Sequence, residues 1–207
     1  MRDFFQAAIP EPVTLLGQKL EPFSIGHWIL LERFDCSYIK GGDATIPDLM
    51  LGVLICCHKY DEFLELSHGQ SIYDLSKKWT KRIGNFDFVE KSKAFTEYID
   101  DAVSSSPKYW VEESSKSNSS KRSGAPYVQT IKTFLLSKTN LTEQEILNRP
   151  FGQSVWDMTT VLEIEGSLRI NSKADDDAAQ EAKEFEKYFD SLTEEQKNKM
   201  RGIPANN

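Results

Sequence analysis

The sequence has few of the residues that usually mark a disulfide-stabilised secreted domain. It contains three cysteines in 207 residues. Three are too few for a disulfide framework, and Cys56 and Cys57 are adjacent in an apolar run, where free cysteine acts as a small hydrophobic residue. A reducing cytoplasm is therefore the expected location of the protein.

Long apolar runs are also absent. The most apolar stretch, Leu49–Cys57, has nine residues and includes Gly52, whereas a helix that crosses a bilayer needs about 20. No apolar signal core follows Met1, and prolines occur early, at Pro10 and Pro12. We therefore expect neither a secretory signal nor a membrane partner.

Basic residues are fewer than acidic ones. The chain has 25 Lys and Arg against 32 Asp and Glu, which gives a net charge of −7. This balance argues against nonspecific binding to nucleic acid as the main role. A basic cluster at 77–82 surrounds Trp79, but that tryptophan belongs to an apolar stripe with Leu75 and Ile83, so a solvated basic face is favoured over a nucleic-acid patch.

Motifs of enzymes and metal centres are missing as well. There is no Gly-rich phosphate loop, dinucleotide fingerprint, His-Glu-x-x-His, paired Cys-x-x-Cys or Gly-x-Ser-x-Gly. Neighbouring side chains in Cys56-Cys57-His58 would point about 100° apart on a helix, which disfavours one tetrahedral metal site. His27 has no identifiable nucleophile beside it, so a structural role is favoured. We predict no catalytic, cofactor-binding or metal-binding residues.

What the sequence does have is aromatic residues with helical spacing: 12 Phe, 7 Tyr and 4 Trp. They predict a mainly α-helical, bundle-like fold with one small N-terminal β-hairpin over Val13–Pro22. Ser24 is the expected N-cap of a buried helix over Ile25–Phe34, and a loop follows to Gly42. Further helices are predicted at about 47–58, 72–83, 87–103, 126–137, 151–165, 174–191 and 194–200, with capping boxes at Thr142–Glu145 and Thr193–Gln196.

The composition changes after residue 103. Nine of the twenty residues in 104–123 are serine, which is typical of a flexible, solvated linker. We therefore predict an N-terminal hairpin plus helical domain over 1–103, a Ser-rich linker over 104–124 and a C-terminal helical region over 125–207.

One internal similarity has two interpretations. Gly69–Ser76 and Gly152–Thr159 share four identical residues of eight, and the other four are similar in size and polarity. Either a helical unit was duplicated, or two independent helix starts use the same capping chemistry. The second interpretation is favoured.

The candidate partner-binding residues are aromatic or apolar. Ala178, Ala182, Phe185, Phe189 and Leu192 follow the +4, +3 spacing of a helix–helix seam, which either binds a partner or covers the domain's own core. Trp156 lies about 100° from its helix's apolar stripe, so it either packs on the N-terminal half, the favoured alternative, or anchors a partner. Trp110 is in the Ser-rich segment, where aromatic residues often become ordered on binding.

Two segments resemble phage tail-assembly-chaperone-like proteins. They are Gly17–Arg33 and the run from Pro126 through Thr142-Glu143, Pro150 and Trp156 to Glu163–Gly166. The resemblance implies a small, mostly helical, non-enzymatic protein of the host cytoplasm, needing no cofactor. Such proteins bind the tape-measure protein, keep it soluble and help recruit tail-tube subunits. An alternative of another class is a structural adaptor that remains in the phage particle, and an enzyme acting around His27 or Cys56–His58 is the least favoured hypothesis.

Overall fold

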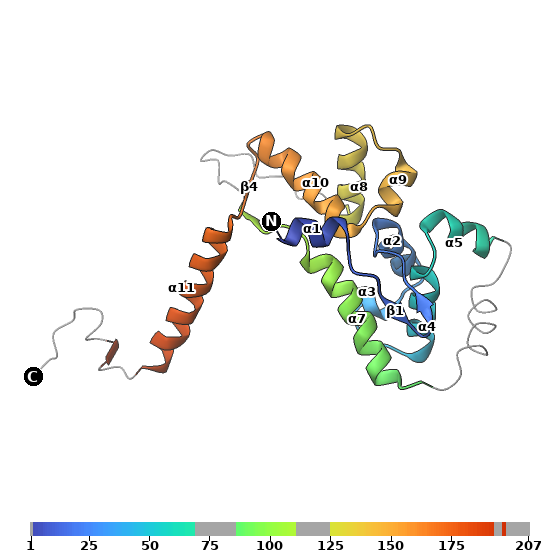
Figure 1. Cartoon of the computed structure of the whole chain (residues 1–207), viewed down its shortest axis with the longest axis horizontal. Coiled ribbons are helices and arrows are strands. Elements are labelled where there is room, and N and C mark those ends of the chain that lie inside the picture. The colour runs from blue at the N-terminus through green and yellow to red at the C-terminus, as the bar shows by residue number, and fades with distance from the viewer. Residues whose placement is uncertain (1, 69–85, 111–124, 193–195, 198–207) are drawn as a thin grey trace, which may run out of the picture. The chain divides into compact units, whose positions relative to one another are not determined.

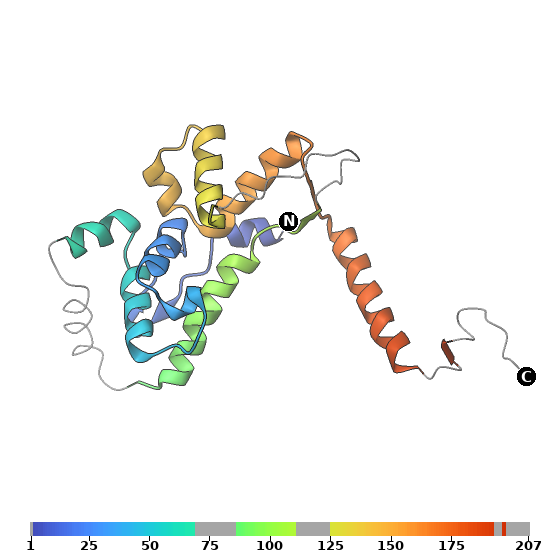
Figure 2. The same cartoon turned by 180° about the vertical axis from the view of Figure 1, so that it is seen from behind.

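A computed structural model describes residues 2–68, 86–110, 125–192 and 196–197 (Figures 1 and 2). It is mainly helical with a small two-stranded antiparallel sheet near the N-terminus, which confirms the predicted fold class. The chain forms two compact units, Met1–Arg169 and Ile170–Asn207.

The described elements of the first unit are short helices joined by tight turns. They are α1 (Arg2–Ala8), β1 (Thr14–Leu15), β2 (Gln18–Lys19), α2 (Ile25–Arg33), α3 (Ser37–Lys40), α4 (Ile46–Cys56), α5 (Tyr60–Ser67), α7 (Phe88–Ser104), β3 (Tyr109–Trp110), α8 (Tyr127–Lys138), α9 (Glu143–Asn148) and α10 (Phe151–Ile164). The chain passes into the second unit through β4 (Arg169–Ile170), which belongs with β3 to a second two-stranded sheet, and continues as α11 (Lys173–Ser191). The predicted helix at 72–83 lies outside the described residues.

The predicted hairpin is confirmed. Thr14–Leu15 pairs antiparallel with Gln18–Lys19. The two residues between the strands, Leu16 and Gly17, have φ angles of 52° and 73°. Positive φ at both central positions is the requirement of a type I′ turn, whose twist matches that of the strands.

Side-chain caps begin the predicted helices as expected. The Ser24 hydroxyl accepts a hydrogen bond from the His27 amide at the start of α2, and the Thr142 hydroxyl caps α9 in a reciprocal box with Glu145. Three short helices lie outside the predicted ranges: α1, α5 and α3, which falls in the 35–42 segment expected to be a loop. They span only seven, eight and four residues, too few for a hydrophobic period to stand out.

A close approach between helices explains the glycine within α4. A Cβ atom at Gly52 would lie 2.5 Å from the ring of Phe95 in α7. Phe95 is fully buried and also packs edge-on against Tyr38, with ring centroids 4.8 Å apart. Only a glycine therefore allows α4 and α7 to approach closely enough to bury this phenylalanine.

The parts of the chain before and after the Ser-rich segment are joined by backbone contacts. The amide of Phe151 donates to the carbonyl of Phe23 over 2.7 Å, and Ser24 forms a β-bridge with Pro150. The ring of Phe151 stacks on Trp28 with centroids 5.4 Å apart. In both views of the fold α10 begins beside α2 (Figures 1 and 2).

The division of the chain therefore differs from the predicted one. Helices α8, α9 and α10, which the sequence assigns to a separate region over 125–207, share one core with the hairpin and helices of 1–103. The second unit begins only at Ile170. The physical reason is that Phe151, at the start of α10, packs against the buried ring of Phe23 and the partly buried ring of Trp28.

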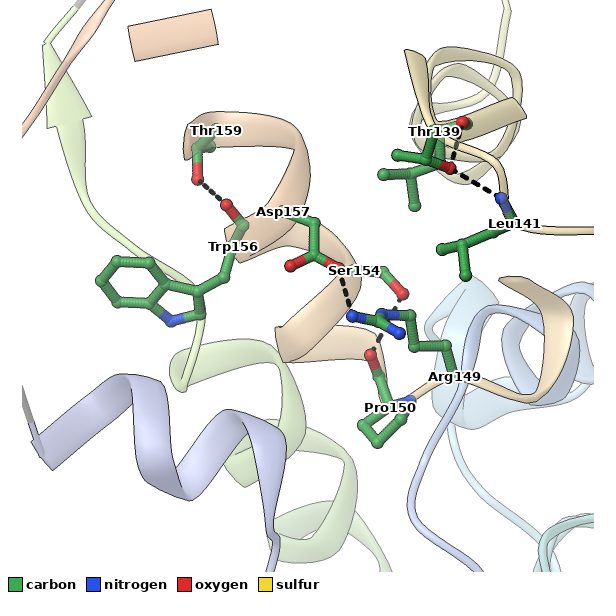
Figure 3. Close-up of polar contacts among 9 residues, drawn as sticks. Thr139, Leu141, Arg149, Pro150, Ser154, Trp156, Asp157 and Thr159 are labelled. Carbon is green, nitrogen blue, oxygen red and sulfur yellow. Dashed lines mark hydrogen bonds and ion pairs between the residues drawn. The ribbon is translucent and has the colours of Figure 1, made fainter. Parts of the chain in front are cut away.

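An ion pair fixes the corner between α9 and α10. Arg149 is the C-cap residue of α9, and its guanidinium lies 2.6 Å from the carboxylate of Asp157 (Figure 3). Beside this ion pair, the Ser154 hydroxyl donates a hydrogen bond to the carbonyl of Pro150. Both partners of the ion pair are about a quarter exposed, at 25% and 28%. This partial shielding makes the contact stronger than an open surface pair.

Candidate functional site

Helix α11 is the longest helix described and the most acidic. It carries seven Asp and Glu against three Lys. Ser172 begins it with a reciprocal capping box to Asp175. No side chain described in α11 is buried. Most of its described side chains are exposed, and Asp175 and Phe189 are partly covered, so much of the surface of this helix is accessible to a partner.

The predicted apolar seam lies on this helix. Phe185 is 56% exposed, and its ring lies 6.2 Å from that of Phe189 in a nearly parallel stack. Lys197 lies over the ring of Phe189 at 5.7 Å. We call the stripe formed by Ala178, Ala182, Phe185 and Phe189 the α11 seam. It is an apolar stripe on an otherwise charged helix.

In the structure the apolar stripe of α11 ends at Phe189 and does not include Leu192, which the spacing predicted as its last member. Leu192 is the C-cap of α11, and its backbone is extended, with φ −78° and ψ 150°. Its side chain therefore does not continue the helical stripe of Phe185 and Phe189. The helix stops at Ser191 ahead of the second predicted capping box, Thr193–Gln196, most of which lies outside the described residues.

Trp156 packs on elements from the N-terminal half, the favoured of its two alternatives. Its indole N–H donates to the carbonyl of Ser105 over 2.8 Å. The indole also meets the ring of Phe4 edge-on, with centroids 5.8 Å apart. Figure 3 shows the indole directed away from the Arg149–Asp157 ion pair. Trp156 therefore ties α10 to α1 and to the end of α7.

Trp110 ends the short strand β3. This places its backbone in the only described portion of the predicted linker, residues 104–110, where Ser105 is buried and accepts the bond from Trp156. The rest of the linker, 111–124, and the copy of the internal repeat at Gly69–Ser76 lie outside the described residues. The other copy, Gly152–Thr159, lies within α10.

His27 occupies a structural position in the first turn of α2. It is 1% exposed, its Nδ1 accepts from the Ser24 amide, and its Nε2 lies 2.8 Å from the carbonyl of His58, to which it donates. Burial lowers the pKa of His27 to about 4, although the hydrogen bond to His58 opposes the shift. The ring is therefore neutral at physiological pH.

This buried histidine predicts a loss of stability in mild acid. The unfolded chain takes up a proton at His27 below pH 6.5, whereas the folded chain resists protonation down to about 4. The stabilisation is therefore complete above pH 6.5 and declines as the pH falls, by about 2 kcal/mol at pH 5. Urea unfolding followed by circular dichroism at several pH values measures it.

His27→Gln is the matched control for this prediction. Glutamine is a usual partner in capping boxes and carries no ionisable group. We expect the variant to lose less stability than the parent between pH 7 and pH 5. Identical pH profiles for the two proteins would contradict the assignment of the effect to His27.

The cysteine side chains are held in their thiol form. Burial raises the pKa of Cys36 and of Cys57 to about 11 and that of Cys56 well above its usual range. The Cys57 sulfur lies 3.2 Å from Nδ1 of His58, but no group of three metal-ligating side chains occurs among the described residues. The predicted burial of Cys56 in a helix is confirmed.

A cavity of about 310 Å³ lies in the first unit, where the N-terminal segment crosses α7 and α10. Its lining includes the aromatic rings of Phe23, Tyr98 and Phe151 and the prolines Pro10, Pro12 and Pro22. The Tyr98 hydroxyl already donates to the carbonyl of Glu21 over 2.7 Å. The sequence does not predict this cavity, because the residues that line it come from segments far apart in the chain.

Comparisons with known proteins do not indicate a family or a function for this chain. No protein-family model matches the chain, and no curated protein or solved structure is similar to it. No helix within the described ranges is long and apolar enough to cross a membrane.

Proposed function

We propose that this protein is a phage tail assembly chaperone that binds the tape-measure protein through the α11 seam. The observation that carries the proposal is the pair of stacked aromatic rings of Phe185, which is 56% exposed, and Phe189, which is partly exposed, on a helix that buries none of its described side chains. The resemblance of the Gly17–Arg33 and Pro126–Gly166 segments to such chaperones supports the choice of partner.

Leaving aromatic rings in contact with water costs free energy. Covering a large apolar side chain contributes about 1.5–3 kcal/mol, so two phenylalanines can support a reversible helix–helix contact. The charged remainder of α11 keeps the unbound helix hydrated. A client rich in amphipathic helices would be kept soluble by the same contact that covers the seam.

Co-expression with the tape-measure protein of the same phage tests the proposal. We expect the client to move from the pellet to the soluble fraction and to co-purify with the full chain. Unchanged client solubility and no co-purification would contradict it. Mass spectrometry of purified particles separates the chaperone from the adaptor hypothesis, because a chaperone is absent from the finished particle and an adaptor is present in stoichiometric amount.

A further inference from the structure

We infer that the α11 seam selects a basic amphipathic helix, rather than a second copy of this chain or an acidic helix. The inference rests on the proposed function, since it names the chemistry of the partner that the seam takes. It depends on where α11 places its charges relative to the apolar stripe.

The spacing of the seam sets a heptad register on α11. Ala182 and Phe189 fall at a positions, and Ala178 and Phe185 fall at d positions. The helix is continuous from Lys173 to Ser191, so this register holds along it.

Both charged residues beside the seam are acidic. In this register Glu181 takes the g position and Glu186 the e position, the two positions that face the flanks of a partner helix. Both side chains are exposed. The lysines stand elsewhere: Lys183 at b lies about 130° from the middle of the seam, and Lys187 at f is nearly opposite it. The lysines of α11 itself are therefore kept away from the contact face, whereas Lys197, beyond the end of the helix, lies over the ring of Phe189.

Self-pairing is disfavoured by this arrangement. In a parallel pair the g position of one helix meets the next e position of the other, which places Glu181 against the second copy's Glu186. In an antiparallel pair that sets the alanines of one helix opposite the phenylalanines of the other, Glu181 lies near Tyr188 and Glu186 near Ala179 of the second copy, so these carboxylates do not meet directly. Each helix still carries seven Asp and Glu against three Lys, and this shared negative charge opposes pairing in either orientation. Lysine or arginine on the partner's flanks removes this repulsion.

The seam also grades from small to large residues. Alanines occupy its N-terminal half at 178 and 182, and phenylalanines its C-terminal half at 185 and 189. Close packing then requires bulky side chains on the partner opposite the alanines and smaller ones opposite the rings. A basic helix with that gradient fits the seam; an antiparallel second copy has the same gradient and is disfavoured by its charge.

A pair of synthetic helices tests the selection with the full chain. Both are about 28 residues long, long enough to form a helix, with leucine at a and d. One carries lysine at every e and g position and the other carries glutamate. Fluorescence anisotropy of the labelled peptides is the measurement. We expect the lysine peptide to bind about tenfold or more tightly than the glutamate peptide, with a difference that shrinks in high salt.

Charge reversal on α11 provides the second arm. Glu181→Lys with Glu186→Lys should reverse the preference between the two peptides. The matched control is Asp177→Lys with Glu184→Lys, which changes the net charge equally but at c positions facing away from the seam. We expect the control to retain the preference for the lysine peptide. Circular dichroism verifies that both variants remain helical.

Three outcomes would overturn the inference: equal binding of the two peptides, no binding of either, or a dimer in sedimentation that the lysine peptide fails to dissociate. Each is distinguishable from failure of the proposed function, which the co-expression experiment measures independently. A tape-measure protein that co-purifies while the peptides show no charge preference would leave the chaperone role standing and remove the charge selection.

Discussion

Replacing Phe185 and Phe189 together by glutamate is expected to abolish co-purification of the tape-measure protein. Both rings belong to the α11 seam, and Phe185 is more than half exposed. Loss of an aromatic anchor at an interface typically costs about 2 kcal/mol or more, so losing two weakens binding by about 1,000-fold. Glutamate is a good helix former, so α11 itself should persist.

Lys187→Glu is the control for this double variant. It changes the net charge by the same amount, but at the f position on the face opposite the seam. We expect it to retain most of the bound client. If the control loses the client as completely as the double variant, charge rather than the apolar seam governs the contact. If the double variant still co-purifies, the seam is not the binding surface.

The second large effect is expected at the junction of the two halves of the chain. Phe151 is 2% exposed, stacks on Trp28 and lies 6.2 Å from the ring of Phe23. Phe151→Ala should lower the free energy of unfolding by about 3–5 kcal/mol, because it removes buried ring surface and leaves a cavity. Urea unfolding measured by circular dichroism reports it.

Phe5→Ala makes the same chemical change at a side chain that is 59% exposed in the first unit. It should cost no more than about 1 kcal/mol, since only its edge contact with Phe4 is lost. The Phe151 variant also tests the organisation of residues 2–169. One cooperative transition that shifts as a whole is expected, whereas two transitions, only one of which shifts, would show that the halves fold separately.

The sequence predicted the local structure well where local chemistry decides it. Ser24 and Thr142 begin helices because their hydroxyls satisfy otherwise unpaired amides, a contact made within four residues. The hairpin over Val13–Pro22 was also predicted, from the short runs that flank Gly17, and its turn lies at Leu16–Gly17. The spacing of Phe151, Val155, Met158 and Leu162 predicts one apolar face on α10, and the first three are buried while Leu162 is partly buried.

The candidate site was predicted in part. The spacing from Ala178 to Phe189 placed an apolar stripe on one helix, which the structure has. The same spacing also predicted Leu192 as part of the stripe, but Leu192 follows the end of the helix. Residue spacing alone does not show where the backbone leaves the helical conformation. Periodicity also left the role of Trp156 open between packing and partner binding, and its hydrogen bond to Ser105 shows that it packs within the protein.

The sequence by itself determined the helical class, the caps, the hairpin and the apolar stripe of α11, because each follows from residues that are neighbours in the chain. Only the tertiary structure decided that α8, α9 and α10 complete the N-terminal core and that the second unit starts at Ile170. The contact between Phe151 and the Phe23–Trp28 rings spans more than a hundred residues, and no local pattern encodes which buried face meets which. That choice is made by the fit of shapes and volumes when the faces pack.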